Sequence, residues 1–390
     1  MHRNIFNLYL IKTAKWFMLV MPVIMLFYDS QHLDVQQVFI LKAIYSIVVV
    51  VCEIPSGYLS DVWGRRNALI LGTILGAVGY SCYALSSSFL FFLAAEICLG
   101  VGQSCISGSD SALLFDTLKD EQRTDDYLRL EGRITSYGNF MEAIAGILAG
   151  FLATYSLRYP MIGQALVAMI GIPAAFMLVE PKSSSTKRSG SFKEIIDVVK
   201  FSLTKDIALR NALFFSSIIG TSTLTMAWLL QLFFKERGIA VSHFGILWTA
   251  LNLLVALGSL RAFRFERKYR SLPLSFAILL GITGSYVLIG YINSMWAFIF
   301  VIVFYLVRGI ATPTLKNMVN QKSDSSVRAT VLSIRNFLIR ILFAVIGPML
   351  GGITDHYGLN ISLMVMGFLI LLMGCWVLYQ EALRSKRALR

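Results

Sequence analysis

The chain has 390 residues, of which 56% are hydrophobic and only 15% are charged. Its 35 Lys and Arg residues outnumber 22 Asp and Glu residues, so the formal net charge is +13. A soluble globular domain carries about 25% charged residues and a disordered chain is far less apolar, so both classes are excluded. A basic nucleic-acid-binding protein is excluded as well, because long apolar runs interrupt every basic cluster. The composition predicts a protein embedded in a bilayer.

Apolar runs long enough to cross a bilayer recur along the whole chain. A crossing needs about 20 apolar residues, and only helices or closed barrels can cross. Continuous runs of this length predict helices, so we expect an all-α polytopic membrane protein with twelve transmembrane helices. The expected spans are residues 5–28, 36–58, 68–86, 89–115, 134–157, 159–179, 207–234, 243–263, 272–292, 294–318, 329–354 and 361–380. The first is too long for a signal peptide and lacks a cleavage site, so we expect it to be retained.

The distribution of basic residues predicts the orientation of the chain. If both termini are cytoplasmic, nearly all Lys and Arg residues outside the spans fall in cytoplasmic segments. The loops of the opposite face contain only Arg158, Lys235 and Arg237. This bias follows the positive-inside rule. We therefore expect a multi-pass protein of the cytoplasmic (inner) membrane with both termini in the cytoplasm.

The chain contains an internal repeat. Residues 26–41 align without gaps over residues 232–247 at an offset of 206, with five identities in sixteen positions. Secondary carriers are built from such repeats, with the substrate site near the bilayer midplane. A basic stretch followed by an amphipathic segment over 192–203 separates the copies, and we expect this segment to form a surface helix. The expected domains are an N-terminal six-helix bundle (1–180), a cytoplasmic linker (181–206) and a C-terminal six-helix bundle (207–390).

The loop after the second span contains the sharpest motif, GYLSDVWGRR. It fits G-x-L-x-D-x-x-G-R-R, the signature between helices 2 and 3 of the major facilitator superfamily. The twelve spans, the repeat and the basic central loop resemble that family over the whole chain, and the preceding Glu53-Ile54-Pro55 resembles a bacterial branch of it. The motif residues are Gly57, Asp61, Gly64, Arg65 and Arg66.

The resemblance implies that this loop latches the cytoplasmic side to helix 11. We expect Gly57 to permit close helix approach and Gly64 to permit a tight turn. Asp61 is expected to pair with a basic group or a helix N-terminus. The alternative for Arg65 and Arg66 is that they only determine topology.

Polar residues follow one helical face in each of three spans. They are Glu96, Gly100, Gln103, Ser107 and Asp110 in span 4; Ser217, Thr221, Thr225, Trp228 and Gln231 in span 7; and Tyr305, Arg308, Thr312 and Lys316 in span 10. The resemblance implies that spans 1, 4, 7 and 10 line a central cavity, so these faces would meet water or substrate. The alternative is that they form hydrogen-bonded seams between helices.

Ionisable residues within the spans point to function because they are costly there. The deep charges divide by half: Glu96 and Glu142 lie in the first half, and Arg308, Arg335 and Arg340 lie in the second. A site with both signs favours a zwitterion or an anion, or holds acid–base pairs that a proton can open. Burial disfavours the ionised form of Glu96 unless Arg308 or substrate compensates its charge. For Glu142 the alternative is a packing seam with neighbouring glycines. The expected binding or coupling residues are Glu96, Gln103, Glu142, Trp228, Gln231, Tyr305, Arg308 and Arg340.

Two ion pairs are predicted at the cytoplasmic gate. Glu53 in span 2 and Arg335 in span 11 lie at similar depths, and the resemblance implies that these spans are neighbours. We expect Glu53 and Arg335 to pair when the inner side is closed, with Asp61 near Arg328. The alternative pairs Glu53 with Lys12 inside its own half.

The sequence therefore predicts a secondary active transporter that works by alternating access. No P-loop is present, so we expect an ion gradient, most plausibly of protons, to supply the energy. We expect export of a small organic compound; the alternative is proton-coupled uptake of a small anionic or zwitterionic nutrient. Neither a metal cluster nor a nucleophile set is found, so we expect no enzyme activity and no cofactor. The expected partners are the substrate, protons and membrane lipids, with no nucleic acid, and we expect a monomer.

Overall fold

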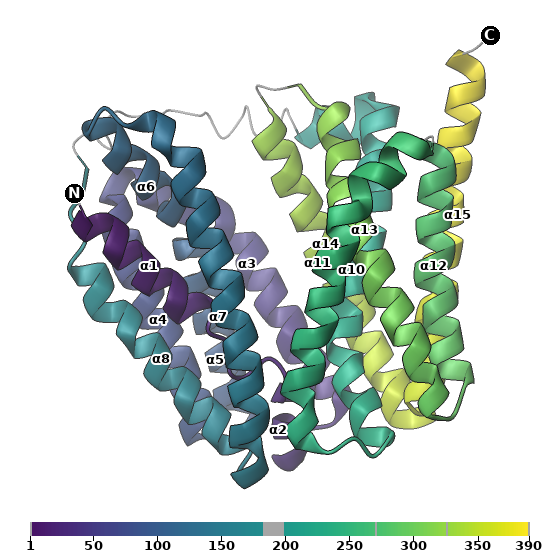
Figure 1. The fold of residues 1–390 in the computed structure, drawn as a ribbon, viewed down its shortest axis with the longest axis horizontal. Coiled ribbons are helices and arrows are strands. Elements are labelled where there is room, and N and C mark those ends of the chain that lie inside the picture. The colour runs from purple at the N-terminus through teal and green to yellow at the C-terminus, as the bar shows by residue number, and fades with distance from the viewer. Residues whose placement is uncertain (1, 182–198, 270, 325–326, 389–390) are drawn as a thin grey trace. The chain divides into compact units, whose positions relative to one another are not determined.

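The computed structural model describes residues 2–181, 199–269, 271–324 and 327–388, and within these ranges the chain is helical with no strand (Figure 1). The α-helices are α1 (His2–Trp16), α2 (Ile24–Ser30), α3 (Val35–Trp63), α4 (Arg65–Leu85), α5 (Phe89–Ile106), α6 (Ser109–Asp120), α7 (Tyr127–Tyr155), α8 (Arg158–Phe176), α10 (Ile207–Glu236), α11 (Phe244–Lys268), α12 (Ser271–Tyr291), α13 (Phe298–Gln321), α14 (Arg328–Tyr357) and α15 (Leu359–Ala388). Short turns are η1 (Thr124–Asp126), η3 (Phe201–Lys205), η4 (Val241–His243) and η5 (Met295–Ala297).

The all-α polytopic fold expected from the sequence is confirmed. Ten of the described helical segments are long and apolar enough to cross a membrane. The two other expected spans, 5–28 and 134–157, correspond to α1 together with α2 and to α7. The expected surface helix over 192–203 falls mostly outside the described residues, and the part that is described leads into the π-helical turn η3.

The chain divides into two compact units. Unit 1 consists of Met1–Leu33, Ile40–Ser189 and Ile239–Thr249, and unit 2 consists of Asp34–Phe39, Gly190–Gly238 and Ala250–Arg390. In unit 1, α4 packs against α5 and α8, and α1 packs against α8. In unit 2, α12 packs against α13 and α15, and α10 packs against α15. In both cases the third span of a half contacts the fourth and the sixth, and the first contacts the sixth, so the sequence repeat corresponds to a repeat of helix packing.

The first span is not one continuous helix. It is interrupted between Trp16, where α1 ends, and Ile24, where α2 begins. Pro22 lies in the interruption and lacks the backbone N–H that a helix needs. The N–H of Leu19 is freed from helical bonding and donates to the side-chain oxygen of Gln164 in α8, at 2.7 Å. The buried side-chain amide of Gln164 thus accepts a hydrogen bond from a backbone N–H that the interruption leaves without a helical partner.

The fourth span is interrupted too, which corrects one expectation. The helix α5 ends at Ile106, Gly108 has a φ of +83°, and α6 begins at Ser109. Left-handed φ values suit glycine because it has no Cβ. The expected single polar face from Glu96 to Asp110 was therefore wrong, since the two residues lie on different helices. Glu96 and Asp110 occupy separate sites.

Candidate transport site and inner-face motif

Glu96 lies in the interior of unit 1, in a cluster of polar side chains from four helices. Its side chain is 2% exposed and its carboxylate is ion-paired with the ammonium of Lys42 on α3. Tyr83 on α4 donates a hydrogen bond to the same carboxylate oxygen, and Tyr28 on α2 donates to it at 3.1 Å. Lys42 therefore compensates the charge of Glu96, a partner that the sequence did not indicate.

Aromatic rings enclose this ion pair. The Lys42 nitrogen lies 5.2 Å from the centre of the Tyr28 ring and 5.7 Å from that of Tyr83. Phe92 stacks on Tyr83 with ring centres 5.3 Å apart. Rings of this kind attract a cation to their faces while keeping water away from it. A buried pair is strongly destabilised when one partner is removed, so the state of Glu96 and that of Lys42 are linked.

Asp110 forms a second buried ion pair of unit 1. Its carboxylate lies 2.8 Å from the ammonium of Lys12 on α1, and the N–H of Ser111 donates to it at 2.8 Å. Lys12 thus has an acidic partner in Asp110, while the alternative that pairs Glu53 within its own half stays a prediction. The ion pair joins the helix before the first interruption to the helix after the second.

The motif after α3 forms a capped turn. Gly64 has a φ of +101° and separates α3 from α4, as a tight turn requires. The N–H groups of Arg65 and Arg66 donate to the two carboxylate oxygens of Glu180, at 2.9 and 2.7 Å. A carboxylate at a helix N-terminus satisfies free donors and complements the helix dipole. Sequence reasoning did not identify Glu180, although an acid directly after the sixth span was visible in it.

The side chains of the motif bind within unit 1. The guanidinium of Arg65 lies 2.7 Å from the carboxylate of Asp116 and 3.7 Å from that of Asp61. Arg66 donates to the carbonyl of Phe176 at 3.0 Å. An added Cβ at Gly57 would meet no atom of the described residues within 4 Å, and the expected close helix approach stays a prediction. The arginines thus tie α4 to α6 and α8, a role beyond topology alone.

In unit 2, the expected substrate residues are mostly enclosed. Trp228 is 8% exposed, and Gln231 and Tyr305 are 1% exposed. The guanidinium of Arg308 lies over the Tyr305 ring, 5.4 Å from its centre. An aromatic face beside a cation gives a surface that can hold an organic group.

The inner part of the span 7 stripe is a seam between helices. Thr221 donates to the carbonyl of Ile339 at 3.3 Å, and Ser217 donates to the carbonyl of Arg335 at the same distance. The Arg335 guanidinium donates to the hydroxyl of Ser216 and, at 3.5 Å, to Asn336. The interhelical alternative therefore holds for this part, between α10 and α14. Arg340, Gln103 and Glu142 are half-buried.

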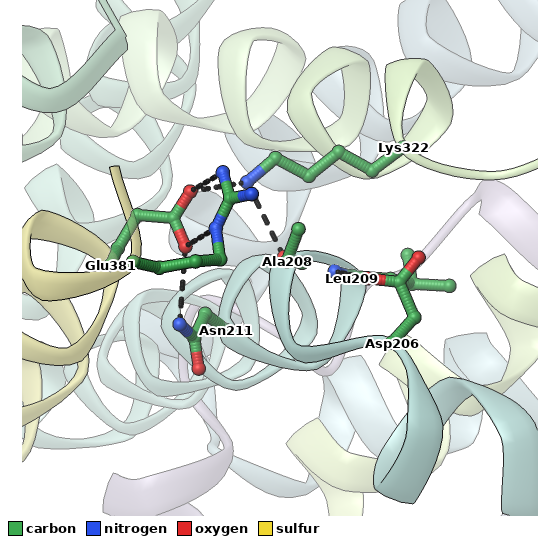
Figure 2. Close-up of polar contacts among 7 residues, drawn as sticks. Asp206, Ala208, Leu209, Asn211, Lys322 and Glu381 are labelled. Atoms are coloured by element: carbon green, nitrogen blue, oxygen red, sulfur yellow. Dashed lines mark hydrogen bonds and ion pairs between the residues drawn. The ribbon is translucent and has the colours of Figure 1, made fainter. Parts of the chain in front are cut away.

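The end of unit 2 at which α10 begins and α13 ends contains a junction that sequence reasoning missed (Figure 2). Glu381 on α15 accepts hydrogen bonds from Lys322 after α13 at 3.0 Å, from Asn211 on α10 at 3.1 Å, and from Arg384. Lys322 also donates to the carbonyl of Ala208 at 3.3 Å. One carboxylate thus joins the inner ends of three helices. The sequence held one indication of this junction, which is the acidic Glu381 in an otherwise basic C-terminal segment.

Two repeated six-span halves, interrupted spans and ion pairs buried among helices define a membrane transporter. A sequence model described as the Major Facilitator Superfamily matches residues 5–348, so the chain belongs to this superfamily. It is 23% identical over 392 residues to Multidrug resistance protein 2 of Bacillus subtilis (strain 168), covering 95% of this chain and 93% of that protein. It is 23% identical over 321 residues to Tetracycline resistance protein, class C, of Escherichia coli, covering 78% of both chains.

Solved structures share the fold. The nucleoside transporter NupG matches with a TM-score of 0.79 and 14% identity over 97% of this chain and 98% of that chain. A D-xylose-proton symporter matches with a TM-score of 0.74 and 12% identity over 96% of both chains. The chain is thus a multi-pass membrane protein with the fold of this transporter superfamily.

Proposed function

We propose that this protein is a secondary transporter that exports a small organic compound by alternating access, in exchange for protons. Membership of the superfamily supports transport, and two relatives are named for multidrug and tetracycline resistance. The observation that carries the proton-coupling part is the buried ion pair of Lys42 and Glu96. Coupling needs a group whose protonation changes the balance between two arrangements of the protein, and this pair supplies one.

The chemistry of the pair follows from its burial. A proton on Glu96 neutralises the carboxylate and leaves Lys42 without its counter-ion. Because both side chains are shielded from water, the protonated pair is stable only if α3 and α5 rearrange or Lys42 gains another partner. Tyr28 and Tyr83 would then donate to a neutral group, which accepts more weakly than a carboxylate. Proton binding thus favours a different arrangement of unit 1.

For the compound itself, we propose the aromatic and amide groups of α10 and α13. Trp228, Gln231 and Tyr305 have large bodies with polar tips, which suit an organic ligand. Arg308 adds a positive charge next to the Tyr305 ring. The proposed set is completed by the half-buried Gln103, Glu142 and Arg340.

The test is transport by purified protein in proteoliposomes, with a panel of labelled organic compounds and a pH gradient of either sign. Glu96→Gln should abolish accumulation against a gradient while exchange of compound across the membrane continues. Glu121→Gln, at the end of α6, is the matched control and should behave as wild type. Unchanged uphill transport by Glu96→Gln would remove Glu96 as the coupling residue.

The second candidate is proton-coupled uptake of a small anionic or zwitterionic nutrient. The observation that favours it is that Arg308 contacts an aromatic ring and forms no ion pair within the described part of the chain. The same proteoliposomes decide between the two: protons moving opposite to the compound support export, and protons moving with it support uptake.

The proposal includes a monomer in the cytoplasmic membrane with both termini in the cytoplasm. Basic inner loops support this orientation. The gate pairs Glu53–Arg335 and Asp61–Arg328 each join residues of different units, and both stay predictions. Glu53→Gln and Arg335→Gln should have non-additive effects on the accessibility of a cytoplasmic-side cysteine, whereas additive effects would exclude the pair.

A further inference from the structure

The last eight residues of α11, in unit 2, expose basic side chains that have no acidic partner. Four such side chains are exposed, and none forms an ion pair within the described ranges of the chain: Arg261, Arg264, Arg267 and Lys268. The segment contains a single acid, Glu266, whose carboxylate accepts a hydrogen bond from Asn317 on α13. The end of α11 therefore has a surplus of positive charge at its surface.

The equivalent stretch of unit 1 pairs its charges within the protein. Arg267 stands 206 residues after Asp61, the acid of the motif at the end of α3. Asp61 lies 3.7 Å from the guanidinium of Arg65, which also pairs with Asp116 at 2.7 Å. In unit 2 the positions equivalent to Asp61 and Arg65 contain Arg267 and Ser271, so the corresponding pair cannot form. The repeat thus has a base here in place of the motif's acid.

Compensation of the helix dipole explains only part of this basic cluster. Arg267 and Lys268 lie in the last turn of α11, where positive charge complements the helix C-terminus. Arg264 and Arg261 lie about one and two turns earlier, where the effect of the dipole has fallen off. The two earlier arginines therefore point to a partner outside the helix itself.

An exposed apolar face leads to these charges along the same side of α11. Leu253 and Leu257 are 62% and 41% exposed, and Arg261 follows four residues after Leu257. Leu260 is 78% exposed and is followed four residues later by Arg264. Residues four positions apart share a helix face, so apolar surface gives way to positive charge along one side of the helix.

Aromatic side chains accompany the charges. Phe263 is 70% exposed, and the rings of Phe265 and Tyr269 stack with their centres 6.3 Å apart. The ammonium of Lys268 lies 5.4 Å from the centre of the Tyr269 ring. Aromatic side chains are enriched at the level of lipid headgroups, where one end of the side chain is apolar and the other is wet. The end of α11 therefore has the chemistry of a helix end at the membrane–water boundary.

We propose that this end of α11 is a docking surface for anionic phospholipids. The four basic side chains bind the phosphates of the headgroups, and the exposed leucines Leu253, Leu257 and Leu260 contact the acyl chains. An anionic phospholipid presents the matching order of chemistry, a negative headgroup followed by apolar chains. Clusters of four or more Lys and Arg residues at the end of a transmembrane helix attract such lipids. That the lipids belong to the cytoplasmic leaflet rests on the proposed orientation of the chain, whereas the binding itself depends neither on transport nor on protons.

The test is equilibrium binding of a fluorescent phosphatidylglycerol to the purified full chain in micelles of a neutral detergent. The comparison lipid is phosphatidylcholine with the same acyl chains and the same label. Wild type should bind phosphatidylglycerol more tightly, and this preference should fall as the salt concentration rises. A Lys or Arg near an anionic lipid contributes about fivefold in affinity. The triple variant Arg261→Gln, Arg264→Gln, Lys268→Gln should therefore weaken the preference by about tenfold or more.

The matched control removes three exposed basic residues from unit 1. Lys119 lies near the end of α6, and Arg129 and Arg133 lie on α7, in a segment (119–133) that contains five acidic residues. The triple variant Lys119→Gln, Arg129→Gln, Arg133→Gln changes the net charge by the same amount and should alter the preference by less than about twofold, since its acids already offset the local charge. Equal losses for the two triple variants would mean that the preference follows overall charge, and would overturn the proposal.

Two further measurements test the role of the side chains and the identity of the ligand. Arg261→Lys, Arg264→Lys together keep the charge and should retain the preference, whereas its loss would indicate a structural role and contradict headgroup binding. Inorganic phosphate should not displace the labelled lipid; displacement would assign the cluster to a soluble anion instead. The proposal is also overturned if wild type does not distinguish the two lipids.

The orientation is measured separately. Tyr269→Cys, treated with a membrane-impermeant thiol reagent in intact cells, should be labelled no more than wild type if this end of α11 faces the cytoplasm. If phosphatidylglycerol binding depends on the basic cluster but this cysteine is labelled from outside, the proposed orientation fails and the docking surface stands.

Discussion

The two units bury charge in different ways. In unit 1 the deep carboxylates have basic partners: Glu96 pairs with Lys42, and Asp110 pairs with Lys12. In unit 2, Arg335 donates to the Ser216 hydroxyl and Arg308 lies over an aromatic ring. The repeat therefore preserved helix packing while the polar chemistry of the halves diverged. Under the proposed function, unit 1 would supply the proton-sensitive ion pair and unit 2 the groups that bind the organic compound.

One end of each unit shows the same divergence, at positions related by the sequence repeat. Asp116 and Lys322 are separated by the repeat offset of 206, yet their charges are opposite. Asp116 is ion-paired with Arg65, whereas Lys322 is ion-paired with Glu381. Both pairs tie the end of the fourth span of a half to another span, which is the third span (Arg65) in unit 1 and the sixth span (Glu381) in unit 2. The position therefore keeps an ion pair, while its charge and its partner span differ.

The largest effect is expected from breaking the Lys42–Glu96 pair. Glu96→Gln or Lys42→Gln should lower the free energy of unfolding by about 3–5 kcal/mol, because the remaining charge stays buried. The double variant Lys42→Met, Glu96→Leu should melt close to wild type. Thermal unfolding in detergent compares these variants, and a double variant with both Gln substitutions, with wild type. If the single effects add in a Lys42→Gln, Glu96→Gln double variant, the two groups do not act as a pair.

A smaller effect is expected at the inner junction of unit 2. Glu381→Gln should cost roughly 2 kcal/mol, because cationic donors and an amide lose a charged acceptor. Arg384→Gln should cost less than half as much, since the Arg384 side chain is 38% exposed. Melting temperatures of the two variants test this order. A Glu381→Gln protein as stable as wild type would mean that the junction is not stabilising.

Asn4 and Asn211, each near the start of the first helix of a half, offer a comparison of the halves. Asn4 binds Thr117 and both backbone groups of Val179, while Asn211 donates to Glu381 alone. Asn4→Ala should therefore cost about 1.5 kcal/mol and Asn211→Ala about 1 kcal/mol or less. Each melting temperature is measured against wild type under the same conditions. A larger loss of stability for Asn211→Ala than for Asn4→Ala would contradict the conclusion that Asn4 contributes more to stability.

The smallest effect is expected from Asp61, the more exposed of the two carboxylates next to Arg65. Asp61 is half-exposed and 3.7 Å from Arg65, and such pairs contribute about 0.5 kcal/mol or less. Asp61→Asn should thus leave the melting temperature nearly unchanged, while Asp116→Asn, which removes the closer partner of Arg65, should lower it. A large loss for Asp61→Asn would indicate that Asp61 has a further partner.

Sequence reasoning predicted the fold well because long apolar runs permit few structures in a bilayer. The repeat, the motif and ten of the spans follow directly from pattern and length. The two interruptions were missed, although Pro22 and Gly108 are the residue types that interrupt helices. Both residues lie in runs that are apolar enough to cross a membrane. The hydropathy of these runs therefore concealed the signal of the two helix-interrupting residues.

The pairing of charges was much harder to predict. Lys42 and Glu96 are 54 residues apart, and no pattern along the chain states that their side chains meet. Periodicity placed Glu96 on a face of its helix but could not say which neighbour that face would meet. Glu180 and Glu381 were missed for the same reason, since each acts on helix ends that are distant in sequence. These contacts depend on how the helices pack in three dimensions, and a pattern along the chain does not specify that packing.

Glu180 also has a consequence for where the polypeptide can be cut. Its carboxylate accepts hydrogen bonds from the first turn of α4, so that helix depends on a residue directly before Pro181. Two separately expressed fragments that divide the chain after this position keep the cap with the helix that it serves. A division at Phe176, where α8 ends, would remove it. The N-terminal fragment must therefore include the four residues that follow its last helix, so that it retains Glu180.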